Sequence, residues 1–291
     1  MNQSELLKKV RAIELAARRL VQQGMAGQYL SAFRGTGMQF REFRNYVWGD
    51  DVRHISWTVS ARTPDPVIKT FEEERERTLF LVVDVSASLR KGPWAEAKAQ
   101  RLAEIAGTLA VSAAESNDKF GLLMYSDQIE KVVPPGKGKT HLLRIIRDVL
   151  AFEPKGKGTD PSLALKQLDQ VLKKQSIVFL LTDMEKLPSE EVLRRTTILH
   201  DFVCIAVEDS REWELANWGY MEVESAERGR PATLDTRSGS LKSFLFQHFE
   251  TRKLLAQEAF KRARSDILWV DAQEDFVPVL QNYFKRRKAG G

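Results

Sequence analysis

The chain has 291 residues, of which 43% are hydrophobic and 29% are charged, a composition typical of a folded globular protein. With 45 basic and 40 acidic residues the net charge is only +5, so the balance does not favour nucleic acid or an anionic membrane as the main partner. The single cysteine, Cys204, excludes an internal disulfide and a cysteine-based zinc site. No apolar run approaches the roughly 18 residues of a membrane span, and the N-terminus lacks the apolar core of a signal peptide. We therefore expect a cytoplasmic protein.

Residues 4–23 place apolar side chains at helical spacing among basic ones, with Ser4 as the N-cap and Gly24 as the stop. A basic amphipathic helix either lies on a membrane surface or packs on its own domain. We expect the second arrangement.

From Gly35 to Trp57, aromatic, basic and acidic residues alternate without a helical or strand period. This pattern indicates a turn-rich segment held by ion pairs and aromatic contacts. Its arginines and acids either form internal salt bridges or contact a partner, and such pairs alone are weak evidence for function. A strand-like run at 67–71 and an acidic run that ends at Glu74 follow.

The apolar run at 79–83 ends in Asp84, Ser86 and Ser88. Consecutive apolar residues without alternation predict a buried central strand of a parallel sheet. In such sheets ligands bind beyond the carboxyl ends of the strands. One carboxylate and two hydroxyls on a short turn offer half of the oxygen shell that Mg²⁺ needs. The simpler alternative is an aspartate that caps the next helix, with serines that fill a turn.

The rest of the chain alternates strands and helices, as a doubly wound α/β sheet requires. We expect a helix at 93–115 opened by Pro93, then a strand at 120–125 that turns at Asp127 into an antiparallel edge strand at 129–133. The other expected elements are helices at 140–151, 161–174, 189–199, 240–264 (capped by Ser240) and 274–287, strands at 177–181, 202–207 and 266–270, and a surface hairpin at 220–236.

Two later stretches carry further oxygen-bearing side chains: Thr159 precedes a helical pattern, and the apolar run at 177–181 leads into Asp183. The resulting set resembles the metal-ion-dependent adhesion site of von Willebrand factor A domains and comprises Asp84, Ser86, Ser88, Thr159 and Asp183. The resemblance implies that the serines and the threonine ligate Mg²⁺ or another divalent cation directly or through water, and that the aspartates mostly hold those waters. The family often has glycine after the last aspartate, whereas this chain has Met184.

A second resemblance lies directly upstream of this domain. The domain-of-unknown-function 58 family has a signature there, and the matching residues are Gly49, Asp50, Asp51, Arg53, Ile55, Trp57, Ser60, Ala61 and Arg62. Ser56 stands where the family usually has aspartate, and the resemblance extends from about Gly35 to Asp183. It implies a von Willebrand factor A-like, mostly parallel sheet with an antiparallel edge strand, preceded by a helical and irregular segment. It also implies a MoxR-type AAA+ ATPase as partner, in chaperone-like assembly or maturation of other proteins.

Gly138, Lys139 and Thr140 precede a helix and so invite comparison with a phosphate-binding loop. The first glycine of that motif would stand at position 133, which is Val133. Without it the backbone cannot wrap the phosphates, and we expect a basic loop that binds no nucleotide.

We expect residues 1–77 to pack on a main domain that spans 78–291. The predicted function is that of a non-enzymatic, metal-dependent adaptor whose loop face captures an acidic side chain of a protein partner. The alternative is a Mg²⁺-dependent phosphohydrolase with Asp84 as nucleophile. Haloacid-dehalogenase-type phosphatases need a second aspartate two positions later, where this chain has Ser86. The four histidines fit no recognisable catalytic motif; they are His54, His141, His200 and His248.

Overall fold

The computed structural model describes residues 3–33, 38–73, 77–90, 92, 94–224 and 231–290. Gly35, Glu74 and Pro93 therefore lie outside the described residues. Within the described part, no helix combines the length and the hydropathy that crossing a bilayer requires.

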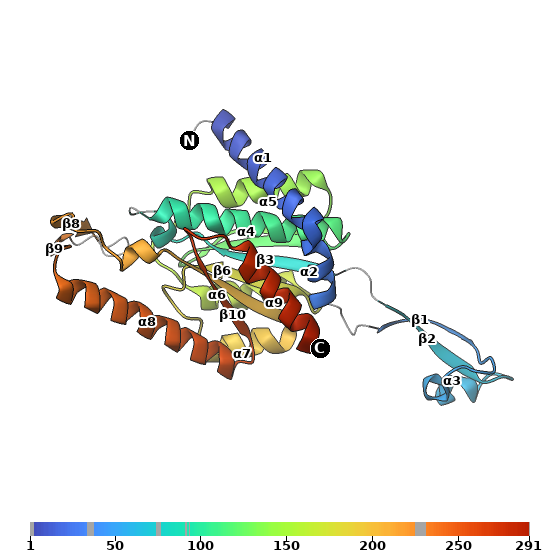
Figure 1. The fold of residues 1–291 in the computed structure, drawn as a ribbon. Coiled ribbons are helices and arrows are strands. Elements are labelled where there is room, and N and C mark those ends of the chain that lie inside the picture. Colours follow the sequence, from blue (N-terminus) through green and yellow to red (C-terminus); the bar gives the residue numbers. More distant parts are fainter. Residues whose placement is uncertain are drawn as a thin grey trace.

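A six-stranded sheet with the order β10-β7-β6-β3-β4-β5 forms the centre of the molecule (Figure 1). Its strands are β3 (Thr78–Asp84), β4 (Lys119–Tyr125), β5 (Ile129–Gly136), β6 (Ile177–Thr182), β7 (Asp201–Glu208) and β10 (Asp266–Asp271). β5 runs antiparallel to β4 at one edge, and every other pairing in this sheet is parallel. The structure thus confirms the predicted von Willebrand factor A-like architecture.

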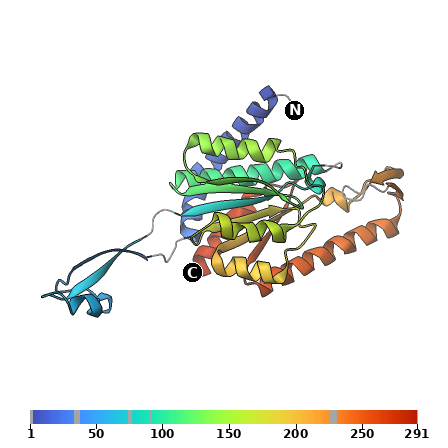
Figure 2. The ribbon, with the colours of Figure 1, turned by 180° about the vertical axis from the view of Figure 1, so that it is seen from behind.

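Helices cover both faces of the sheet, which explains the unbroken apolar runs in the central strands. In β3, Leu79, Leu81 and Val83 belong to one core, and Phe80 and Val82 belong to the other. The first core is covered by α1 (Gln3–Leu20), α2 (Ala26–Ala32), α4 (Ala95–Glu115), α5 (Lys139–Ala151) and α9 (Val277–Gly290). Figure 2 shows the opposite face, which is covered by α6 (Pro161–Val171), α7 (Glu190–Leu199) and α8 (Gly239–Arg262).

The N-terminal helix packs on the body, mainly on α4 and α5. Close approach needs Gly107 on α4, because a Cβ atom there would lie 2.7 Å from the Cγ2 atom of Ile13. Gly24 was expected to end the helix, but the chain continues through a wide turn at Val21–Met25 into α2. Gly24 has φ 111°, so it supplies a kink and not a stop.

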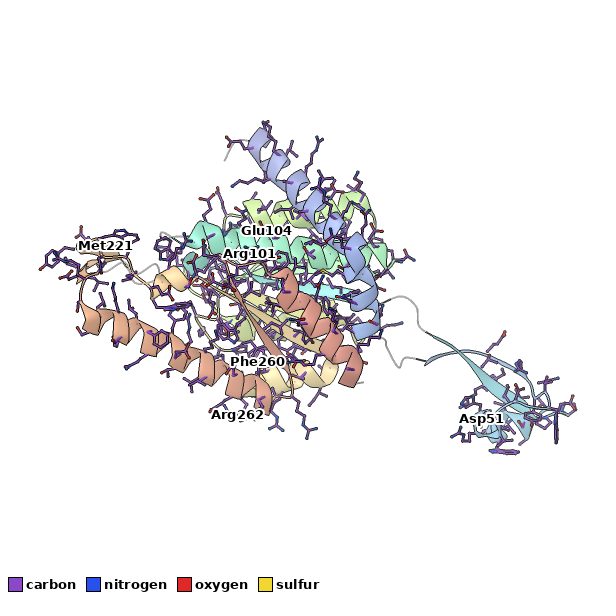
Figure 3. The ribbon with its side chains drawn as sticks, viewed as in Figure 1. Asp51, Arg101, Glu104, Met221, Phe260 and Arg262 are labelled. Carbon is purple, nitrogen blue, oxygen red and sulfur yellow. The ribbon has the colours of Figure 1, made fainter. Side chains whose placement is uncertain are left out.

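The signature segment forms an arm, which we define as residues 38–73. β1 (Met38–Asn45) and β2 (Val67–Glu73) pair as an antiparallel ribbon, and η2 (Val52–His54) and α3 (Trp57–Ser60) lie between them. The arm extends away from the body (Figure 1), and Asp51 lies at its far end (Figure 3). This differs from the expected docking on the sheet. The arm buries its own small apolar group instead, since Val67 and Ile68 are shielded and Ile68 pairs with Ile55.

The expected hairpin between β7 and β10 is confirmed. It comprises β8 (Tyr220–Glu224) and β9 (Pro231–Asp235), and the short turn η4 (Ser210–Glu212) leads into it from β7. The helix that follows begins at Gly239, one residue earlier than predicted. Its N-cap is Ser238, whose hydroxyl accepts the backbone N–H of Leu241, and not Ser240.

Candidate metal centre

Asp84 ends the central strand and is only 2% exposed. Its Oδ1 accepts the backbone N–H of Ser86 at 2.9 Å. Its Oδ2 accepts the hydroxyl of Thr182 at 2.9 Å and that of Tyr125 at 3.4 Å. Three donors from β4, β6 and the loop after β3 therefore fix this carboxylate at the carboxyl edge of the sheet.

Ser86 and Ser88 present two hydroxyls on the turn after β3. The turn is closed by the N–H of Leu89, which donates to the carbonyl of Ser86, and the two Oγ atoms lie 3.1 Å apart. Adjacent oxygen ligands of an octahedral Mg²⁺ with bonds of about 2.1 Å lie about 3.0 Å apart. The spacing of the two hydroxyls is therefore one that neighbouring ligands of a single cation can have.

Thr159 lies directly before α6. The next residue, Asp160, donates its N–H to the carbonyl of Ser126 just beyond β4, which places Thr159 at the same edge of the sheet. Asp160 itself caps α6 by accepting the N–H groups of Ser162 and Leu163. The hydroxyl of Thr159 is buried and has no hydrogen-bond partner among the described residues. A buried hydroxyl without a partner costs about 1–3 kcal/mol, so this oxygen is available to act as a ligand.

Asp183 follows β6 and is 1% exposed. The next residue, Met184, has φ 56°, the left-handed conformation that glycine adopts at lower cost. Its N–H donates to the hydroxyl of Thr182 at 3.0 Å. Met184, which is buried, therefore adopts the backbone conformation for which glycine is favoured at this position.

Two residues that the sequence did not suggest complete the cluster. The ammonium of Lys98, on the first turn of α4, lies 3.4 Å from Oδ2 of Asp183 and 2.6 Å from Oε1 of Glu212 on η4. Lys98 is 3% exposed. The sequence does contain a sign that Lys98 is buried, because Lys98 lies on the same face of α4 as the buried Ala95 and Leu102. Thr182 was also missed, since a threonine at a strand end has no distinctive pattern.

The cluster contains more acidic groups than ammonium groups. Burial, together with the charge of Asp183, raises the pKa of Asp84 to about 7. Burial likewise raises the pKa of Glu212. Burial acts to lower the pKa of Lys98, but the charges of Asp183 and Glu212 outweigh it and raise that pKa. Asp183 and Glu212 share the ammonium of Lys98, and Asp183 also repels Asp84. An added cation between the two aspartates would relieve that repulsion.

The donor set therefore fits a hard divalent cation. Within the described residues, no group of three or more His, Cys, Asp or Glu side chains is arranged to hold a metal. A site here depends on hydroxyl oxygens as well as carboxylates, which suits Mg²⁺ better than a softer metal.

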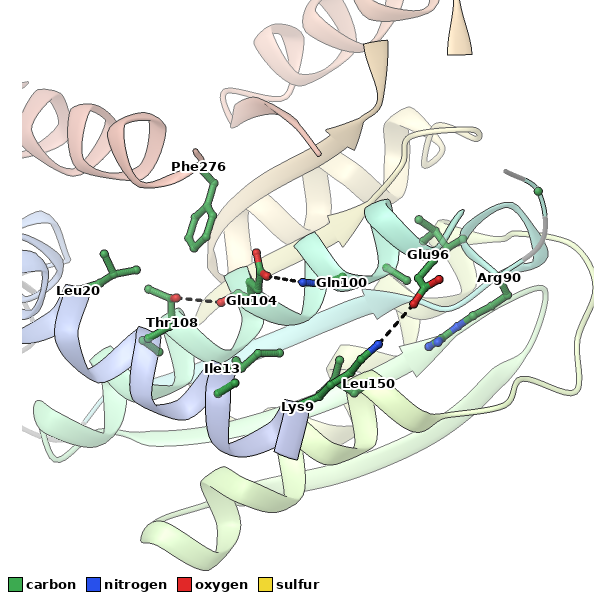
Figure 4. A pocket seen from close by; sticks show the side chains of 16 residues that line it. Lys9, Ile13, Leu20, Arg90, Glu96, Gln100, Glu104, Thr108, Leu150 and Phe276 are labelled. Carbon is green, nitrogen blue, oxygen red and sulfur yellow. Dashed lines mark hydrogen bonds and ion pairs between the residues drawn. The ribbon is translucent and has the colours of Figure 1, made fainter. Parts of the chain in front are cut away.

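A second candidate lies elsewhere on the body. A groove of about 730 Å³ lies between α1 and α4, with Ala16, Leu20 and Phe276 among its mostly apolar lining (Figure 4). The ammonium of Lys9 pairs with Glu96 at 3.4 Å across it. A ligand site normally also has a few convergent polar groups that fix the ligand. Polar groups that line the groove bond to one another, Lys9 to Glu96 and Gln100 to Glu104. At the strand edge the hydroxyl of Thr159 has no partner among the described residues, so the strand-edge cluster is the candidate site.

Comparison with known proteins identifies the family of the chain. The family described as "Protein of unknown function DUF58" matches residues 42–253. The uncharacterized proteins Rv1480 of Mycobacterium tuberculosis and Mb1516 of Mycobacterium bovis are each 27% identical over 228 residues, which cover 77% of this chain and 72% of theirs.

Solved structures are similar at lower identity. BatB from Bacteroides thetaiotaomicron matches with a TM-score of 0.46 and 13% identity, over 74% of this chain and all of that one. A von Willebrand factor type A protein from Catenulispora acidiphila has a TM-score of 0.41 and 9% identity, over 76% and 44% of the two chains. A mussel byssus matrix protein with a zinc-occupied adhesion-site motif has a TM-score of 0.39 and 18% identity, over 46% and 38%. At these scores the likenesses carry no information about the ligands of this chain.

Proposed function

Since the chain belongs to the DUF58 family, we propose that it is a non-enzymatic adaptor that binds a protein partner through a divalent cation at the carboxyl edge of its sheet. The observation that carries the proposal is the buried hydroxyl of Thr159, which has no partner among the described residues and lies at the same edge as two buried aspartates. Ser86, Ser88 and Thr159 would hold the cation, and Asp84 and Asp183 would hold its waters. When bound, the cation would offer an open position to a carboxylate from outside.

The hydrogen bonds of Asp84 support binding over phosphoryl transfer. A phosphoryl nucleophile needs a carboxylate oxygen that can reach the substrate. Both oxygens of Asp84 instead accept hydrogen bonds from the protein, and Tyr125 and Thr182 donate from the sheet side. The carboxylate is thereby suited to orienting the loop and its ligands.

The partner follows from the family resemblance. We propose that a MoxR-type AAA+ ATPase, or a protein that it helps to assemble, offers the acidic side chain to the cation. Mg²⁺ is the proposed ion, because the donors are oxygens. A cytoplasmic location is part of this proposal, since such an ATPase needs ATP.

A capture experiment with full-length protein tests the adaptor role. The immobilised chain is exposed to a lysate of its own organism in Mg²⁺ or in chelator, and bound proteins are identified by mass spectrometry. Wild type should retain an AAA+ ATPase in Mg²⁺ and lose it in chelator, and Ser86→Ala should lose it in both conditions. Ser240→Ala, which changes an exposed serine on α8, should behave as wild type. A partner that binds equally well in chelator would overturn the metal-dependent mechanism.

A further inference from the structure

Lys98 is placed to compete with a divalent cation for the same carboxylate. Oδ1 of Asp183 accepts the N–H of Glu185 at 3.3 Å, whereas Oδ2 faces the ammonium of Lys98 at 3.4 Å. The carboxylate therefore has one oxygen engaged by backbone and one directed at a cation.

We infer that Lys98 is an internal counter-ion of the metal site, which weakens divalent-cation binding, and that Glu212 retains its ammonium when the cation takes Asp183. This inference rests on the proposed function, because it concerns the same site. Lys98 and Glu212, which are outside the predicted ligand set, would thus determine the affinity of the site for the cation.

The distances define the role of Glu212. Its Oε1 lies 2.6 Å from the ammonium, closer than the 3.4 Å of Asp183. A buried ammonium left without a partner is strongly unfavourable. A cation that displaces Lys98 from Asp183 therefore leaves it paired with Glu212, which lowers the cost of the exchange. Without Glu212, Lys98 would depend on Asp183 alone and would resist displacement.

The surrounding contacts keep both residues in place during such an exchange. The guanidinium of Arg211, beside Glu212 on η4, lies 4.3 Å from the ring centre of Trp94, which directly precedes α4. The ring centres of Trp94 and Trp218 lie 6.0 Å apart, and Trp218 is on the connection to β8. The first turn of α4 and the loop after β7 are thus packed together. Lys98 needs to shift only its side chain and not its helix.

Binding of Mn²⁺ to the full-length protein tests the inference, with free Mn²⁺ measured by electron paramagnetic resonance. Lys98→Met should bind Mn²⁺ at least about tenfold more tightly than wild type, since a competing buried charge is gone. Glu212→Gln should bind it more weakly. Lys253→Met, which removes an ammonium that pairs with Glu208 at the end of β7, should bind as wild type and serves as the control.

The double variant separates competition from a general effect of charge. If Glu212 acts through Lys98, Glu212→Gln should have little effect in the Lys98→Met background. If it acts only as a nearby negative charge, it should weaken Mn²⁺ binding equally in both backgrounds, which would overturn its assigned role. Should Lys98→Met fail to fold, Glu212→Gln against wild type decides, and unchanged or tighter binding would overturn the inference.

Different results would contradict the counter-ion role of Lys98 and the metal-dependent adaptor function. If wild type binds Mn²⁺ and Lys98→Met binds it no better, the counter-ion role is wrong while the metal-dependent adaptor stands. If only Lys98→Met binds Mn²⁺, the counter-ion role is supported in its strongest form. If neither wild type nor any variant binds Mn²⁺, the metal-dependent function is wrong and the inference falls with it.

Discussion

At the carboxyl edge of the sheet, charged side chains are buried, whereas on the arm they face solvent. Asp84, Lys98 and Asp183 are at most 3% exposed and form one connected cluster. On the arm, Arg53 pairs with Asp51 at 2.7 Å, and both groups are open to water. Aromatic residues differ in the same way. Trp94 packs between Arg211 and Trp218 near the cluster, while Trp48 on the arm is 95% exposed.

This difference in burial determines how much an ion pair contributes to the free energy of unfolding. Removing one member of a buried pair typically costs about 3–5 kcal/mol, while exposed pairs contribute about 0–1 kcal/mol. On the arm, Arg44 pairs with Asp50 and Arg53 pairs with Asp51. The bonds from Arg53 lower the pKa of Asp51 to about 2, yet solvent screens that pair. Stability should therefore depend on charges at the sheet edge and hardly on those of the arm.

The largest effect is expected for Lys98→Met without metal. Asp183 and Glu212 would then be buried without their ammonium partner, and the free energy of unfolding should fall by about 3–5 kcal/mol. Arg53→Met on the arm, the matched change, should leave the denaturation midpoint unchanged. Urea unfolding of both variants in chelator measures this. A loss below about 1 kcal/mol for Lys98→Met would mean that the cluster is not energetically coupled.

A smaller effect is expected from a buried histidine of the body. His200 ends α7, is 5% exposed, and neither ring nitrogen has a partner among the described residues. Burial lowers its pKa, so below the unfolded value of about 6.5 the unfolded chain binds the proton more readily. Stability should therefore fall as pH falls from 7 to 5, by at most about 1.4 kcal/mol per pH unit for one proton.

His200→Phe should make that pH dependence shallower, and His54→Phe, on the exposed arm, should not. Urea unfolding at pH 5, 6 and 7 compares the two variants with wild type. Identical slopes for wild type and His200→Phe would show that the ring is hydrated in solution.

The smallest effect is expected for Trp48→Ser at the arm. Because the indole is almost fully exposed, the change in unfolding free energy should stay within about 0.5 kcal/mol. Trp94→Ser, which removes the ring under Arg211, should lower stability by more. A clear loss for Trp48→Ser, seen in thermal unfolding, would mean that the arm packs on the body or on another chain in solution.

The central sheet could be predicted because parallel strands with both faces covered are continuous apolar runs bounded by turns. The arm strand β1 could not be predicted, since its register shifts between Phe40 and Glu42 and the alternation of side chains is broken. The arm was also too short to suggest a shape of its own. In the structure, Val67 and Ile68 of the arm are buried.

The sequence also indicated only part of the site. The spacing of Asp84, Ser86 and Ser88 reflects a short loop, and local sequence carries that information. Lys98 and Glu212 come from a helix and a distant connection, and only the packing of α4 against η4 brings them together. Ion pairs between distant elements have no fixed spacing in the sequence, so sequence patterns do not predict them. A lysine on the apolar face of a helix does indicate a buried ammonium.

The Mg²⁺ response of thermal unfolding in wild type and Thr159→Val tests the metal site most directly. Because the hydroxyl of Thr159 makes no hydrogen bond within the described part of the chain, the variant in chelator should be at least as stable as wild type. At a Mg²⁺ concentration of one hundred times the dissociation constant, wild type should gain about 2.7 kcal/mol. Thr159→Val should gain much less at that concentration, because one ligand oxygen is missing. An equal gain in both proteins, or none in wild type, would contradict a cation site at this edge of the sheet.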